Sequence, residues 1–201
     1  MTRDKNSKHK ATQQKLKQQV DQGIAAATEQ RGVCILLTGD GKGKSSSAFG
    51  MVMRSLGYGH KVGIVQFIKG KQLSGEEIFI KEKYPEIPFY QMGTGFTWET
   101  QDREADIAAA LATWKEAEKL LQNAEINLVV LDELTYMLAF DYLTEASIIT
   151  AIQNRPKQQS VIITGRGGGS ALRAIADTVA EVKNIKHAYD FGVQAQKGVD
   201  F

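Results

Sequence analysis

The stretch TGDGKGKSSS, from Thr38 to Ser47, decides the fold of this chain. It follows the apolar run VCILL, which predicts a buried strand, and it leads into SSAFGMVMRSL, whose apolar spacing predicts a helix. A glycine-rich turn from a strand into a helix brings backbone N–H groups and the positive end of the helix dipole against one anion. We therefore expect Gly39, Gly41 and Gly43 to form a phosphate site.

The end of this stretch, Gly43-Lys44-Ser45, resembles the end of a Walker A loop. Lys44 can add a mobile cation to bound phosphates, and the hydroxyl of Ser45 can ligate Mg²⁺. The usual pattern has four residues between its first glycine and Gly-Lys, whereas three separate Gly39 from Gly43. The loop is thus one residue short, and the alternative reading is a glycine-rich connection without a ligand.

A second candidate element follows the apolar residues 128–131, where Asp132 and Glu133 take the form of a Walker B segment. One or both carboxylates could hold Mg²⁺ directly or through water. An acidic pair after a strand can also be the solvated start of a helix. The glycine-rich loop elsewhere in the chain favours the metal site.

Strand-like and helical patterns alternate along the chain in the order KVGIVQF, AAALATWKEAEKLL, INLVVLDE, TEASIITAIQ with Thr144 as its cap, SVIIT, SALRAIA and TVAEV. Continuously apolar strands fit a sheet covered on both faces, and the alternation makes that sheet mainly parallel. The sequence predicts a three-layer α/β fold. Ligands of such sheets bind at the carboxyl ends of the strands, here from Thr38, Gln66, Asp132 and Thr164 onward.

Length and composition fit one globular domain with a tail, since 42% of the 201 residues are hydrophobic and 24% are charged. No apolar stretch reaches the roughly 20 residues that span a bilayer, and MTRDKNSKHK lacks the apolar segment of a signal peptide. A cytoplasmic location without membrane contact is therefore expected. Cys34 lies in an apolar run and is expected to be buried, and His9, His60 and His187 are isolated, without metal-ligand spacing.

Residues 1–30 form a basic N-terminal segment, expected to be disordered or helical. Its first 20 residues hold six Lys/Arg and one Asp, so the rest of the chain is slightly acidic, with 19 Lys/Arg against 22 Asp/Glu. Leu16, Val20 and Ile24 could form one narrow apolar stripe on a helix. Because a stretch rich in Gln, Lys and Asn is usually solvated, nucleic acid is not the expected partner.

The segment MGTGFTWETQ, from Met92 to Gln101, places Phe96 and Trp98 outside any recognisable strand or helix. One interpretation is that both aromatic rings fold back into the core, as loop aromatics often do. Gly93 and Gly95 favour instead a segment that moves. Two large rings on such a segment are suited to cover the flat surface of a ligand.

Taken in order, TGDGKGKSS, GTGFTWET, VVLDELTY, ITGRG and FGVQAQKGVDF resemble the bacterial corrinoid adenosyltransferase family, from about Arg31 to Phe201. The resemblance implies a RecA-like P-loop fold for residues 31–201, a homodimer, and ATP, Mg²⁺ or Mn²⁺ and a corrinoid as ligands. It also implies a reduced flavoprotein as electron donor for Co(II). Residues 1–30 would fold over the bound corrinoid.

The resemblance further implies that the triphosphate lies reversed relative to ordinary P-loop enzymes, so that C5′ faces cobalt and triphosphate leaves. The residues that would bind it are Gly39, Asp40, Gly41, Lys42, Gly43, Lys44 and Ser45, with Arg166 as a further cation. Asp40 stands where the family usually has Asn, and its charge beside the phosphates could weaken ATP binding or alter metal use.

The implied metal ligands are Ser45 and Glu133, with Asp132 in support. Phe96 and Trp98 would lie against the lower face of the corrin and displace its axial ligand, which leaves a four-coordinate Co(II) that is easier to reduce. Together with Lys44, these two aromatic residues are the ones expected to act in catalysis.

Two other functions stay open. An ordinary NTPase or nucleoside kinase would use the same loop, with Glu133 activating water or a hydroxyl, and would release ADP. A nucleotide-gated binding module would present Phe96 and Trp98 to a protein or to single-stranded nucleic acid, with binding that falls steeply with salt in the latter case. Neither explains why a shortened phosphate loop is combined with GTGFTW, whereas adenosyl transfer uses both.

Overall fold

The computed structural model describes residues 2–68, 73–93, 102–167 and 169–201 of the chain, and it divides into two units, Met1–Gln30 and Arg31–Phe201. The first unit contains one long helix, α1, Thr2–Ala26. Leu16, Val20 and Ile24 lie on this helix and are exposed, so the expected apolar stripe is present and open to solvent.

The second unit is built on a six-stranded sheet with the strand order β3-β2-β4-β5-β1-β6. Its strands are β1 Cys34–Thr38, β2 Val62–Gln66, β3 Phe89–Gln91, β4 Leu128–Asp132, β5 Ser160–Thr164 and β6 Thr178–Glu181. All pairings between the described neighbouring strands are parallel, which confirms the expected parallel sheet.

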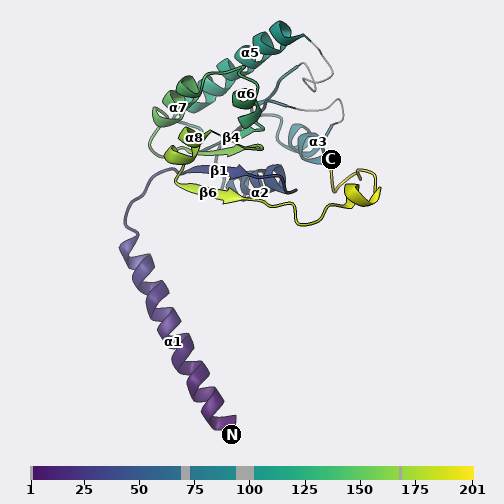
Figure 1. Cartoon of the computed structure of the whole chain (residues 1–201). Helices are drawn as coiled ribbons and strands as arrows, with labels where there is room; N and C mark the ends of the chain where they lie inside the picture. The colour runs from purple at the N-terminus through teal and green to yellow at the C-terminus, as the bar shows by residue number, and fades with distance from the viewer. Residues whose placement is uncertain (1, 69–72, 94–101, 168) are drawn as a thin grey trace. The chain divides into compact units, whose positions relative to one another are not determined.

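Helices cover both faces of this sheet (Figure 1). They are α2 Lys44–Gly57, α3 Gly75–Lys83, α5 Arg103–Gln122, α6 Thr135–Ala139, α7 Glu145–Gln153 and α8 Ser170–Ile175, and the 3₁₀ helix η1, Ala188–Phe191, follows β6. The three-layer α/β fold predicted from the sequence is therefore confirmed.

Alternate residues of the buried strands feed the two core layers, because successive side chains of a strand point to opposite faces. In β4, Val129 and Leu131 pack with side chains of α5, α6 and α7. Val130 packs on the opposite face with α2 side chains such as Phe49 and Val52. Both faces of the central strands are thus buried, and the strand ends are the part of the sheet left to meet a ligand.

Most of the longer helices begin at a capping side chain, whereas α2 does not. Ser74, Asp102 and Thr144 cap α3, α5 and α7, and the expected cap at Thr144 is confirmed by a 3.3 Å hydrogen bond from the Ser147 N–H to its Oγ1. The N-cap of α2 is Gly43, and no side chain in the described part of the chain caps this helix. Its first-turn N–H groups are therefore left for a ligand.

Cys34 in β1 is buried, as expected, and burial raises the pKa of its thiol to about 11. None of the described helices has the length and apolar character needed to cross a bilayer.

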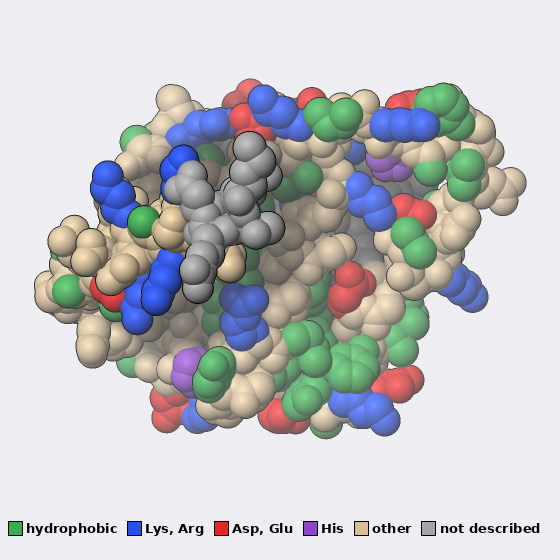
Figure 2. Space-filling view, turned by 90° about the horizontal axis from the view of Figure 1, so that it is seen from below, with side chains coloured by type: hydrophobic (Ala, Val, Ile, Leu, Met, Phe, Trp, Pro, Cys, Tyr) green, Lys and Arg blue, Asp and Glu red, His purple; other side chains and the backbone are tan. Residues whose placement is uncertain are grey.

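The surface in Figure 2 carries basic, acidic and hydrophobic side chains interspersed with one another. Charge on this face is mixed in sign, in keeping with the small formal net charge of +2 of the whole chain.

Candidate active site

The carboxyl ends of the strands open into a cavity of about 1080 Å³. This volume lies just above the roughly 300–1,000 Å³ usual for small-molecule sites. The residues expected from the sequence that line the cavity are Asp40, Gly41, Lys42, Gly43, Lys44, Ser45, Asp132, Glu133 and Arg166. Gly39 shapes the loop from outside the cavity lining. Phe96 and Trp98 lie outside the described residues.

The glycine-rich loop is held against the chain that leaves β6. The N–H of Gly41 donates to the carbonyl of Val182 at 2.7 Å, and a Cβ on Gly41 would lie 2.7 Å from the carbonyl of Lys183. Gly39 and Gly43 have φ angles of 100° and 118°, which side-chain-bearing residues rarely adopt. This loop conformation therefore depends on glycine at these positions.

Lys44 is a buried cation that lines the cavity. Its side chain is buried, and Nζ donates a 2.9 Å hydrogen bond to the carbonyl of Gly41, back across the loop. Burial lowers the pKa of Lys44, Arg166 lowers it further, and Glu133 opposes the shift. Among the described residues only Gly41 accepts a hydrogen bond from Nζ, so this ammonium has donors left for a phosphate.

Asp132 is buried at the end of β4, and both of its carboxylate oxygens accept hydrogen bonds from neighbouring strands. The hydroxyl of Thr164 on β5 donates to Oδ1 at 2.6 Å, and Nε2 of Gln66 on β2 donates to Oδ2 at 2.9 Å. Asp132 is thus fixed by protein donors, and its role beside a metal ion would be a supporting one.

Glu133 lies in a different environment from its neighbour. Its N–H donates to the hydroxyl of Thr164 at 2.9 Å, and its φ of 58° turns the chain sharply away from β4. Its Oε2 is buried without a hydrogen-bond partner among the described residues. The pKa of Glu133 is raised to about 7, first by burial and then by the charge of Asp132, while Lys44 and Arg166 oppose the rise.

A buried carboxylate oxygen without a protein partner is suited to a metal ion. Mg²⁺ is usually held by one or two carboxylates together with substrate phosphates, not by a cage of protein ligands. The described residues contain no group of three or more His, Cys, Asp or Glu that could hold a metal by themselves. Glu133, with Ser45 lining the same cavity, therefore fits a metal that arrives with a nucleotide.

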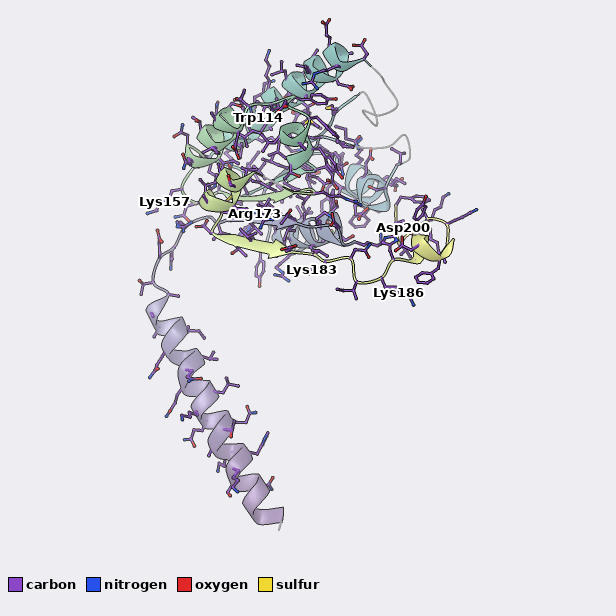
Figure 3. All side chains as sticks on the ribbon, viewed as in Figure 1. Trp114, Lys157, Arg173, Lys183, Lys186 and Asp200 are labelled. Atoms are coloured by element: carbon purple, nitrogen blue, oxygen red, sulfur yellow. The ribbon has the colours of Figure 1, made fainter. Side chains whose placement is uncertain are left out.

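Lys42 is engaged by the end of the chain. Its Nζ forms a 2.8 Å ion pair with Oδ1 of Asp200, and the N–H of Gln196 donates to Oδ2 of the same carboxylate at 2.9 Å. These contacts, the Lys42 hydrogen bond first, lower the pKa of Asp200. Asp200 and Lys186 both lie on the C-terminal segment (Figure 3), so this segment is tied to the phosphate loop. Arg166 lines the same cavity.

The C-terminal segment FGVQAQKGVDF belongs to the motifs of the family resemblance, but none of its residues was expected in the site. The structure makes it one wall of the cavity, through His187, Ala195, Gly198, Val199, Asp200 and Phe201. His187, expected to be isolated, also caps η1, where its Nδ1 accepts from the N–H of Tyr189 at 3.2 Å. The sequence signal for this wall was the motif FGVQAQKGVDF, which contains all of these residues except His187.

A glycine-rich loop at a helix N-terminus, a buried lysine and an acidic strand end around one cavity define a P-loop nucleotide-binding protein. The family model described as ATP:corrinoid adenosyltransferase BtuR/CobO/CobP matches residues 30–201. The chain belongs to this family, which confirms the resemblance carried by the sequence motifs.

Several relatives are similar over almost their whole length. The corrinoid adenosyltransferase of Pseudomonas aeruginosa is 50% identical over 198 residues, which cover 98% of each chain. The corrinoid adenosyltransferase CobA of Salmonella typhimurium is 48% identical, and the corrinoid adenosyltransferase of Escherichia coli K12 is 46% identical. In both alignments 98% of this chain and 99% of the relative are covered.

Proposed function

We propose that this chain transfers the 5′-deoxyadenosyl group of ATP to the Co(I) centre of a corrinoid and releases triphosphate. The observation that carries the proposal is that one cavity is lined by the glycine-rich loop, by Lys44 and by Glu133, whose Oε2 has no hydrogen-bond partner among the described residues, in a chain that belongs to this family. The site supplies positive charge and a metal-binding carboxylate at the place where a triphosphate would lie.

The chemistry makes limited demands on the protein. A bond forms between cobalt and C5′ while the bond between C5′ and oxygen breaks, and the electron pair of that bond leaves with the triphosphate. Cobalt goes formally from Co(I) to Co(III), and no proton needs to be moved. Catalysis therefore rests on the positioning of two substrates and on the neutralisation of the leaving group.

The chain's own groups match those demands. Lys44 and the N–H groups of the loop and of the first turn of α2 bind the triphosphate, and Arg166 adds a cation at the rim. Ser45 and Glu133 would hold Mg²⁺, and Asp132 supports Glu133. When bound, the metal ion neutralises part of the negative charge on the leaving triphosphate.

The remaining expectations belong to the same proposal. Phe96 and Trp98 cover the lower face of the corrin. Residues 1–30 fold over the bound corrinoid, and the apolar stripe of α1, which is exposed in this structure, becomes buried when they do so. Residues 31–201 form the transferase domain of a cytoplasmic homodimer, and a reduced flavoprotein supplies the electron that converts Co(II) to Co(I).

The direct test mixes the purified protein with Mg²⁺, ATP and chemically reduced cob(I)alamin under anaerobic conditions. Loss of the Co(I) absorbance, a light-sensitive adenosylated product and one triphosphate per product are expected. Unchanged Co(I) with release of ADP and phosphate would assign the chain to the NTPases, and no turnover at all would favour a binding module.

A further inference from the structure

A chain of hydrogen bonds crosses the carboxyl edge of the sheet from α3 to β4. Nζ of Lys81 donates to Oε1 of Gln91 at 3.3 Å, and Nε2 of Gln91 donates to Oε1 of Gln66 at 2.9 Å. Nε2 of Gln66 then donates to Oδ2 of Asp132, also at 2.9 Å. Lys81 is anchored by its ion pair with Glu77, at 2.8 Å. Four elements are thus linked side chain to side chain.

The residues at the two ends of this series of hydrogen bonds, Lys81 and Asp132, fix which group donates and which accepts in each of them. Lys81 can only donate hydrogen bonds, and an ionised Asp132 can only accept them. The amides of Gln91 and Gln66 between them must therefore both point their NH₂ groups toward Asp132. Turning either amide around would bring two hydrogen-bond acceptors face to face. Because Gln66 and Asp132 are buried, no water molecule could donate a hydrogen bond to these acceptors.

The link joins two regions with different proposed roles. Asp132 precedes Glu133 at the nucleotide cavity, and Gln66 lines that cavity. Gln91 is the last residue of β3, and the next residue, Met92, is tied by its N–H to the carbonyl of Gln66 at 2.9 Å. The chain then continues into the segment that contains Phe96 and Trp98. The side chains of Gln66 and Gln91 therefore link the phosphate site to the end of β3, the strand that precedes this segment in the sequence.

We propose that Gln66 and Gln91 are positioning residues that couple nucleotide binding to corrinoid binding, an inference that rests on the proposed function. When the nucleotide and its metal ion bind beside Asp132, their charge changes the hydrogen bond that Asp132 accepts from Gln66. The amide contact between Gln66 and Gln91 passes this change to the end of β3, and the bound nucleotide thereby raises the affinity for the corrinoid. Linkage makes the effect reciprocal, so the corrinoid raises the affinity for ATP by the same factor.

Two variants of Gln91 separate this coupling from side-chain packing. Gln91→Glu keeps the shape and the contact with Lys81 but has no donor for Gln66 when ionised, so two acceptors face each other. Gln91→Met keeps a similar volume without hydrogen bonds. Gln122→Met, at the exposed end of α5, is the matched control for the loss of a glutamine amide.

The measurement is the affinity for cob(II)alamin with and without saturating Mg²⁺ and ATP, since Co(II) does not attack C5′ and no transfer interferes. The ratio of the two dissociation constants is the coupling factor. We expect a factor of at least about fivefold in the unaltered chain and in Gln122→Met, reduced at least about threefold by either Gln91 variant. Affinity for ATP alone should stay within about twofold in the Gln91 variants.

A coupling factor of one in the unaltered chain, or an unchanged factor in both Gln91 variants, would overturn the proposal. If the Gln91 variants do not fold, Lys81→Met removes only the exposed end of the link, and we expect it to reduce the factor in the same direction. Adenosyl transfer from cob(I)alamin is measured in parallel on the unaltered chain. Its absence rejects the proposed function, whereas transfer with unaffected coupling rejects only the positioning role.

Discussion

The guanidinium of Arg31 and the carboxylate of Asp177 meet in two hydrogen bonds of 2.8 and 2.6 Å. The N–H of Cys34 donates to the same carboxylate at 2.7 Å. These bonds tie the start of the second unit to the residue before β6, and they lower the pKa of Asp177 from 3.8 to about 2, the Arg31 hydrogen bond being the largest cause.

Replacing Asp177 by Asn should lower the free energy of unfolding by about 1 kcal/mol at neutral pH. Because the pKa is lower in the folded state, this contribution is complete above about pH 4 and is lost as the pH falls through about 2. Urea denaturation of both chains across this range checks it. A difference that does not narrow with falling pH would mean that the carboxylate charge is not the cause.

Replacing Lys44 by Met should lower kcat/KM for adenosyl transfer by at least about 100-fold, since it removes the buried cation proposed to face the leaving triphosphate. Lys61→Met is the control, because Lys61 lies on the surface in an ion pair with Glu125. Rates are measured with cob(I)alamin under anaerobic conditions. Equal activity of both variants would remove Lys44 from the mechanism.

Replacing Glu133 by Gln should raise the Mg²⁺ concentration needed for half-maximal activity by at least about tenfold. The physical reason is the buried Oε2, which has no partner among the described residues and would lose its negative charge. Titration of activity with Mg²⁺ at fixed ATP measures the change, and Glu125→Gln on the surface serves as the comparison. An unaltered Mg²⁺ requirement would point to a different metal ligand.

Replacing Trp98 by Ala should impair the reaction that starts from Co(II) much more than the reaction with pre-reduced Co(I). An aromatic face that displaces the axial ligand matters only for the reduction step. Both assays use the same protein preparation and differ only in the reductant. Equal losses in the two would reject the axial-displacement role.

The thiol of Cys34 should react slowly with a thiol reagent at about pH 8 in the folded chain and rapidly after unfolding. Burial closes access to it and raises its pKa to about 11, so the thiolate that reacts is scarce. As this is the only cysteine in the sequence, the rate is unambiguous. A fast reaction without denaturant would show that β1 opens readily.

Local patterns were enough to predict the layers, the parallel strands and the edge at which the site lies. The runs VCILL, LVVL and VIIT identified three central strands, and their ends carry Thr38, Asp132 and Thr164. The strand β3 was not predicted, because three residues are too few for alternation to show.

The contacts that shape the site could not be read in the same way. The ion pair of Lys42 with Asp200 joins positions far apart in the sequence, and the amide contact of Gln66 with Gln91 depends on strand order. Neither contact produces a periodic pattern in the amino-acid sequence from which it could be predicted. Lys42 was predicted as a phosphate cation without its ion pair to Asp200, and no residue was predicted to link the phosphate site to the end of β3.

Glu133 has a left-handed backbone conformation, with φ of 58°, which costs stability at a residue that is proposed to act in the site. An L-residue in this conformation costs roughly 1–2 kcal/mol, a cost that glycine avoids. A search for thermostable variants guided by backbone conformation alone would therefore choose glycine here and delete the carboxylate proposed to bind the metal. The proposed role of Glu133 therefore requires that such libraries be selected for turnover as well as for stability.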